Sequence, residues 1–88
     1  MGFDHAKRRI NFQKHNIDLA ECECVFDLPM LTREDTSETY GEQRFVSLAW
    51  LISRVVVLVW TDRDDSPRLI SCREALKYKK QAYTRAFH

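Results

Sequence analysis

Two arginines flank a short polar turn in the second half of the chain. Arg63 follows the β-branched run RVVVLVWT, Arg73 follows the apolar stretch PRLISC, and a turn is predicted at 65–67. A guanidinium group presents a planar fork that meets two phosphate oxygens at once, so each arginine is a candidate phosphate ligand. The alternative is an ordinary ion pair, and Asp62 and Asp64 are near enough in sequence to Arg63 to provide one.

The predicted hairpin raises an objection to a shared site. Arg63 and Arg73 follow consecutive antiparallel strands, and the ends of such strands normally lie at opposite edges of a sheet. The two side chains meet only if Arg63 begins the turn and the Arg73 side chain, at the start of the next helix, points back towards Arg63. The sequence leaves both arrangements open.

Five further side chains have a possible role in RNA chemistry or in structure. His15 is a candidate general acid or base, because histidine side chains exchange protons near neutral pH, although it can equally stabilise the C-terminal end of a helix. Lys14 and Lys77 are candidate RNA-binding cations or solvated lysines. Tyr83 can stack on a base or belong to the core. Glu74, the carboxylate next to Arg73, is interpreted as a residue at the start of the last helix.

Composition favours one small domain. The 88 residues are 44% hydrophobic and 11% aromatic, which is typical of a globular protein. No apolar run approaches the ~20 residues of a membrane span, and the first ten residues lack a signal-peptide core, so a cytoplasmic address without membrane contact is expected. The spacing of Cys22, Cys24 and Cys72 matches no zinc motif, and we interpret all three as reduced structural cysteines. No metal and no cofactor is predicted.

Charge is distributed unevenly although the net charge is only +1. Residues 1–17 hold four bases against one acid, residues 18–42 hold eight acids against one base, and residues 43–88 hold nine bases against four acids. If the fold brings the two basic segments together, they form a positive face suited to a polyanion. Ordinary solvated surfaces are the alternative.

The pattern of apolar residues predicts two N-terminal helices. The first begins after Asp4 as N-cap and ends at Asn16, a residue that tolerates the left-handed conformation. The second begins at Asp18, with Glu21 completing a capping box, and stops at Pro29.

After Pro29 the pattern changes to that of strands. Short strands are predicted within 29–35, 43–51, 54–61 and 67–73, with a polar loop at 35–42, and the chain closes with a helix over 74–87. Trp50 and Trp60 are assigned to the core. Two helices, about four mainly antiparallel strands and a final helix define an α+β domain covering residues 1–88.

Six segments, in this order and spacing, carry a resemblance to a known family. They are FDHAKR (3–8), KHNID (14–18), VFDLP followed by LTRED (25–35), GEQRFVSL (41–48), VVVLVWTDR (55–63) and RLISCREA (68–75). The chain resembles the BrnT family of bacterial type II toxins over nearly its whole length.

The resemblance implies a RelE-like α+β fold and metal-independent cleavage of RNA that inhibits translation and growth. It implies neutralisation by a BrnA-like antitoxin with a ribbon-helix-helix domain, and binding of promoter DNA only through the toxin–antitoxin complex. By this resemblance Arg63 and Arg73 are catalytic residues. The pair Lys14 and His15 also matches the family pattern.

Two residues depart from the family pattern. Asn16 replaces a usual glycine, which is a mild change. Lys79 replaces a glutamate that usually stands four residues before the tyrosine of the last helix. If that glutamate takes part in acid/base chemistry, the chain must work without it. A catalytically idle homologue that binds its antitoxin and helps to repress transcription is therefore the alternative function.

Overall fold

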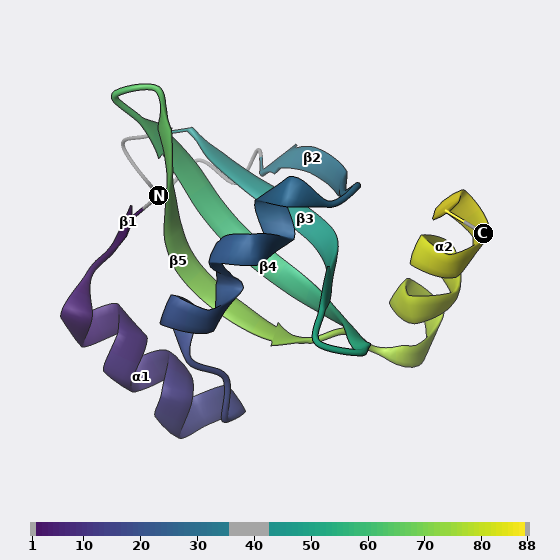
Figure 1. Cartoon of the computed structure of the whole chain (residues 1–88), viewed down its shortest axis with the longest axis horizontal. Helices are drawn as coiled ribbons and strands as arrows, with labels where there is room; N and C mark the ends of the chain where they lie inside the picture. The colour runs from purple at the N-terminus through teal and green to yellow at the C-terminus, as the bar shows by residue number, and fades with distance from the viewer. Residues whose placement is uncertain (1, 36–42, 88) are drawn as a thin grey trace.

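The computed structural model describes residues 2–35 and 43–87, so the predicted polar loop lies almost wholly outside the described residues. The chain folds into one five-stranded sheet with helices against it (Figure 1). The elements in chain order are β1 (Gly2–Phe3), α1 (His5–His15), the 3₁₀ helix η1 (Leu19–Asp27), β2 (Leu31–Asp35), β3 (Arg44–Leu51), β4 (Arg54–Arg63), β5 (Ser66–Glu74) and α2 (Lys77–Phe87).

The sheet has the strand order β1-β5-β4-β3-β2 and is mixed. Strands β2 to β5 pair antiparallel, as predicted, but β1 adds a fifth strand that pairs parallel to β5 through Gly2 and Phe3. The sheet therefore has five strands and not the four or so that were predicted. A two-residue strand is too short to show an alternating pattern, and its pairing with residues more than sixty positions away exists only in the folded chain.

The first helix agrees with the prediction at both ends. The Asp4 carboxylate accepts a hydrogen bond from the Ala6 backbone N–H at 2.7 Å, and Asn16 ends the helix with a φ of 56°. Since the left-handed region favours glycine and asparagine, Asn16 serves the same purpose as a C-terminal glycine.

The second helix is present but winds differently from the predicted α-helix. It is a 3₁₀ helix, in which the Glu21 N–H donates to the Asp18 carbonyl at 2.9 Å. The carboxylate of the N-cap residue Asp18 accepts from the Ala20 N–H, and not from the Glu21 N–H as in the predicted capping box. Leu19, Cys22 and Val25 are all fully buried. Residues three apart eclipse in a 3₁₀ helix. The spacing of the buried residues therefore suits this winding, which places all three on the sheet.

The last helix begins three residues later than predicted. Glu74 is the final residue of β5, where it pairs with Val56, and the Ala75 N–H still bonds to the Val55 carbonyl at 3.0 Å. The interpretation of Glu74 as a helix residue is therefore wrong. Pairing with the central strand continues the extended conformation up to Ala75, and α2 starts only at Lys77.

The two faces of the sheet are covered to different extents. Helices α1 and η1 lie on one face over the main core, which includes Leu19, Val56, Leu58 and Leu69. Helix α2 stands at one end of the other face in Figure 1, over a smaller cluster made of Val55, Val57, Ala75 and Tyr83. Much of the second face therefore has no helix over it.

The two tryptophans differ in their environments. Trp60 packs between Phe26 and Phe45, and its Nε1–H donates to the Ser47 hydroxyl at 2.9 Å, in agreement with a core position. Trp50 is 40% exposed, so its assignment to the core is wrong. It lies on the second face, where α2 covers only one side of its ring.

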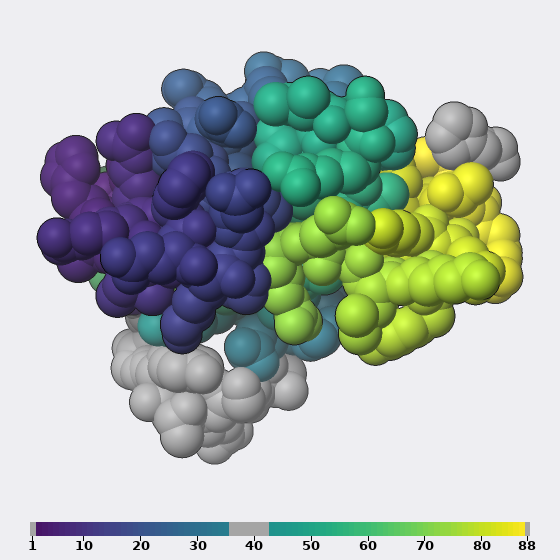
Figure 2. Space-filling view, turned by 90° about the horizontal axis from the view of Figure 1, so that it is seen from below, coloured from purple at the N-terminus to yellow at the C-terminus, as the bar shows by residue number. Residues whose placement is uncertain are grey.

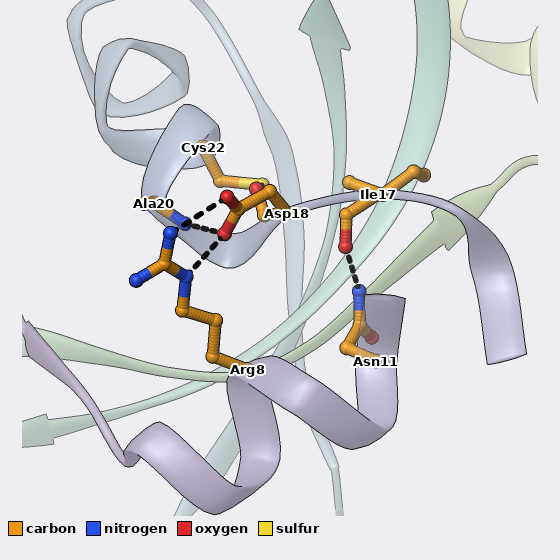
Figure 3. A network of polar contacts seen from close by, with 6 residues as sticks. All are labelled: Arg8, Asn11, Ile17, Asp18, Ala20 and Cys22. Carbon is orange, nitrogen blue, oxygen red and sulfur yellow. Dashed lines mark hydrogen bonds and ion pairs between the residues drawn. The ribbon is translucent and has the colours of Figure 1, made fainter. Parts of the chain in front are cut away.

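An ion pair joins α1 to the start of η1 (Figure 3). Arg8 donates from Nε and Nη2 to the two oxygens of Asp18, at 2.7 and 2.9 Å. The hydrogen bond from Arg8, with a smaller contribution from the Ala20 N–H, lowers the pKa of Asp18 from its ordinary 3.8 to about 2. Asp18 thus both caps η1 and ties it to α1.

We expect Asp18→Asn to lower the melting temperature, with a pH dependence of defined sign. Because the folded-state pKa lies below 3.8, the charged pair stabilises the fold fully above about pH 5 and loses its effect as the pH falls towards 2. The difference in melting temperature between wild type and Asp18→Asn should therefore be constant near neutrality and shrink below about pH 4. Thermal melts from pH 7 to pH 2.5 measure it.

The control is Asp27→Asn, which removes an exposed carboxylate from the other end of the same helix. A difference between wild type and Asp18→Asn that stays unchanged down to about pH 2.5 would contradict the assignment.

Candidate functional site

A groove of about 230 Å³ lies on the sheet face that α1 and η1 leave open. Its apolar side chains are Leu31, Val46, Leu48, Val57 and Leu76, and its polar ones are Thr32, Arg33, Arg73, Tyr78 and Lys79. Four strands and the first turn of α2 contribute to it. The groove therefore combines an apolar floor with a cationic rim.

Strand register explains how the groove is built. Leu31 pairs with Leu48, Leu48 pairs with Val57, and Val57 pairs with Arg73, so these four residues form one row across β2, β3, β4 and β5. Directly paired residues point to the same face of a sheet. Arg73 therefore lies at the end of an apolar row and lines the groove.

Three cations from separate parts of the chain line this groove. Arg33 comes from the edge strand β2, Arg73 from β5 and Lys79 from α2. Arg33 and Arg73 are exposed. Within residues 2–35 and 43–87, no carboxylate forms an ion pair with Arg73, so the described residues do not support the ion-pair interpretation of this side chain. The arrangement suits an anion of more than one negative oxygen.

The nearby carboxylate of Glu74 is engaged elsewhere. It accepts from Lys80 Nζ at 2.6 Å and lies 3.8 Å from Arg54. The hydrogen bond and charge of Lys80 lower the pKa of Glu74. Because a carboxylate with a lowered pKa is a weaker base, Glu74 is poorly suited to take a proton from a substrate hydroxyl.

Arg63 lies far from Arg73. Arg63 pairs with Ser66 at the β4–β5 turn, whereas Arg73 pairs with Val57. From Val57 to Arg63 the strand advances by roughly 20 Å at ~3.3 Å per residue. The objection raised by the hairpin geometry therefore holds, and the two arginines do not form one site.

Lys14 and His15 are on the other side of the sheet. They occupy the last turn of α1, and α1 is fixed to β5 by hydrogen bonds between Asn11 and the Cys72 backbone. Figure 2 shows the dark-blue end of this helical region beside the lime-green end of β5. The side chain of Cys72 points into the α1 core, so that of Arg73, the next residue, points away from it. His15 lies in position to stabilise the helix end.

Tyr83 belongs to the smaller core cluster. It is 5% exposed, its hydroxyl donates to the Pro29 carbonyl at 3.1 Å, and its ring packs against Trp50 and Phe87. Little of the ring remains for a base to stack on. Lys77 is exposed at the start of α2 and lines a separate hollow with Lys80 and Arg85.

Arg33 and Tyr78 were not among the site residues predicted from the sequence. The alternation of β2 contains a usable signal for Arg33, because Leu31 and Arg33 lie two residues apart on one strand and so share a face. No comparable signal exists for Tyr78, whose place in the groove depends on where α2 starts.

Potential metal ligands do not gather in the described part of the chain. No group of three His, Cys, Asp or Glu side chains is positioned to share an ion there. Cys22 and Cys72 are buried, Cys24 is exposed, and all three are free thiols. Among the helices of residues 2–35 and 43–87, none is both long and apolar enough to cross a membrane.

The fold and the groove define a small α+β domain with cations gathered over an open sheet face. A family model described as "Ribonuclease toxin, BrnT, of type II toxin-antitoxin system" matches residues 3–78. The chain belongs to this family, which confirms the resemblance in the sequence. The family implies an RNA target and an antitoxin partner. The match ends at Tyr78, so Lys79 and Tyr83 lie beyond it. A comparison with curated proteins gives no match.

Proposed function

We propose that the protein is a metal-independent endoribonuclease that binds the scissile phosphate of RNA in the groove around Arg73. The family is one of ribonuclease toxins. The observation that carries the location is the row Leu31, Leu48, Val57 and Arg73, which places an exposed arginine beside an apolar floor.

The proposed reaction uses a nucleophile that RNA itself provides. The 2′-hydroxyl oxygen attacks the adjacent phosphorus, a new bond forms between them, and the bond from phosphorus to the 5′-oxygen breaks. The products are a 2′,3′-cyclic phosphate and a free 5′-hydroxyl, and a proton passes from the 2′-oxygen to the leaving oxygen. The phosphorane between them carries extra negative charge, which Arg73 and Arg33 are placed to stabilise.

The candidate residues for proton transfer are less well placed in this site than the residues that bind phosphate. His15 lies on the opposite side of the sheet, and Glu74 is held in ion pairs. By the resemblance carried by the sequence segments, Lys79, which lines the groove, replaces a glutamate. We therefore expect charge stabilisation and positioning to supply most of the rate. Lys79 also favours the second candidate function, a catalytically idle homologue that acts as antitoxin-binding partner and transcriptional co-repressor.

The proposed partner is a BrnA-like antitoxin with a ribbon-helix-helix domain, acting in the cytoplasm. Type II toxins are held by protein antitoxins, so a protein partner follows from the family. In this proposal the free chain inhibits translation and growth by cutting RNA, and only the complex with the antitoxin binds promoter DNA.

We expect the purified chain to cleave single-stranded RNA at the same rate in EDTA as in magnesium. The 2′-hydroxyl supplies the nucleophile, and the cations of the groove supply the charge that a metal ion would otherwise provide. Gel analysis of a labelled RNA, with detection of 2′,3′-cyclic phosphate ends, measures it.

Cleavage that stops in chelator and returns with magnesium would refute metal independence. If no RNA is cut in either buffer while an antitoxin still binds tightly, the idle homologue is the correct function. Lys79→Glu is the informative companion variant, since restored acid/base chemistry should raise the rate of a slow enzyme.

A further inference from the structure

Tyr78 is an exposed aromatic side chain among cations. It is 62% exposed, although large aromatic residues usually bury most of their surface. It lies on the first turn of α2, in the segment Lys77-Tyr78-Lys79-Lys80, and it lines the groove together with Arg33 and Arg73. Tyr78 is not a member of the smaller core cluster, so its ring is available to a ligand in the groove.

The backbone that carries Tyr78 is ordered by the helix, and Lys79 contacts the ring. Both the Lys79 and Lys80 N–H groups bond to the Leu76 carbonyl, at 2.9 and 3.0 Å, which closes the first turn of α2 around Tyr78. Lys79 Nζ lies 5.5 Å from the centre of the Tyr78 ring, in a cation–π contact. Further along the helix, the buried Tyr83 anchors α2 to the sheet. An ordered backbone at Tyr78 reduces the entropy that is lost when a ligand binds.

The groove has the size and polarity of a subsite for one nucleotide. Its volume of about 230 Å³ is below the ~300–1,000 Å³ of sites that enclose a whole drug-sized ligand. The apolar floor of Leu31, Leu48 and Val57 suits a flat base, and the cations at the rim suit its phosphates. Aromatic rings beside backbone-tracking cations are the general means by which proteins bind single-stranded nucleic acid.

We infer that Tyr78 stacks on an unpaired base of the RNA while Arg73 holds the neighbouring phosphate, so that the groove selects single-stranded over duplex RNA. This inference rests on the proposed function and names the substrate class of the same site. In a duplex both faces of each base are covered by its neighbours, so the ring has no face to stack on. Tyr83, for which the sequence left base stacking and a core position open, is buried in the smaller core cluster.

The test is a binding experiment that does not depend on cleavage. Three probes are labelled for fluorescence anisotropy: a 2′-O-methyl single-stranded oligonucleotide, which cannot be cut, its duplex, and a single strand of the same length with abasic nucleotides. Wild type, Tyr78→Ala and Tyr78→Phe are compared. Phe12→Ala is the matched control, since Phe12 is 52% exposed on α1.

We expect Tyr78→Ala to weaken binding of the normal single strand by about tenfold or more, the usual effect of losing one stacked base. Tyr78→Phe should bind like wild type because stacking needs the ring and not the hydroxyl. Neither variant should change binding of the duplex or of the abasic strand. Phe12→Ala should change none of the three.

Several outcomes would overturn the inference. Equal affinity of wild type and Tyr78→Ala for the normal strand would do so, as would an equal loss with the abasic strand or a wild type that does not prefer single strands. A Tyr78→Ala that binds RNA normally but loses antitoxin binding would show that this surface contacts protein. The proposed function is judged separately, since a wild type that cuts no RNA but still shows the tyrosine effect refutes cleavage alone.

Discussion

Arg73→Ala is expected to slow RNA cleavage about a hundredfold while the fold stays intact. Loss of one well-placed cation at the phosphorane removes ~3 kcal/mol of transition-state stabilisation, which corresponds to this factor in rate. Arg73→Lys keeps the charge but not the planar fork, so it should recover only part of the rate. Single-turnover cleavage of a labelled RNA measures both variants.

The fold should tolerate the change because Arg73 is exposed and, within residues 2–35 and 43–87, has no ion-pair partner. Surface substitutions of this kind usually alter the free energy of unfolding by less than ~0.5 kcal/mol. Arg63→Ala is the matched control, since Arg63 lies at the far end of the same hairpin. A folded Arg73→Ala that cuts at the wild-type rate would refute the location of the site, and an effect of Arg63→Ala alone would move it to the β4–β5 turn.

Asn11→Ala is expected to destabilise the domain strongly. Asn11 is 3% exposed, and its amide Nδ2 donates to the carbonyls of Ile17 and Cys72, at 2.9 Å each. Its Oδ1 accepts from the Cys72 backbone N–H at 2.9 Å. One side chain thus joins α1, the segment before η1 and the middle of β5. Figure 3 shows the bond from Asn11 to Ile17.

Truncation to alanine leaves three buried backbone groups without these partners. Each unsatisfied group costs ~1–3 kcal/mol, so a loss of about 3 kcal/mol or more is expected from a total stability of roughly 5–15 kcal/mol. For a domain of this size that lowers the melting temperature by about 12 °C or more. Urea and thermal unfolding measure the change.

Gln13→Ala, on the exposed side of the same helix, is the control and should change stability by less than ~0.5 kcal/mol. An Asn11→Ala protein as stable as wild type would show that water satisfies the three backbone groups. A loss as large in Gln13→Ala would show that the buried hydrogen bonds of Asn11 are not the cause of the effect.

Local signals in the sequence were sufficient for most of the elements. Asp4 and Asn16 mark the ends of α1 because capping is a short-range hydrogen-bond and backbone effect. The β-branched run RVVVLVWT identifies β4, in which residues 55–58 are all buried. The six quoted segments identified the family without any structure, because they depend on residue types and spacing alone.

Tertiary structure decided what those elements bring together. The groove exists because strand register aligns Leu31, Leu48, Val57 and Arg73, and register is a relation between segments far apart in the chain. The same cause separates Arg63 from Arg73. The start of α2 depends on pairing of Glu74 with Val56, which local helix signals do not contain. Tyr78 enters the groove only because that pairing delays the helix, so its position could not be derived from sequence.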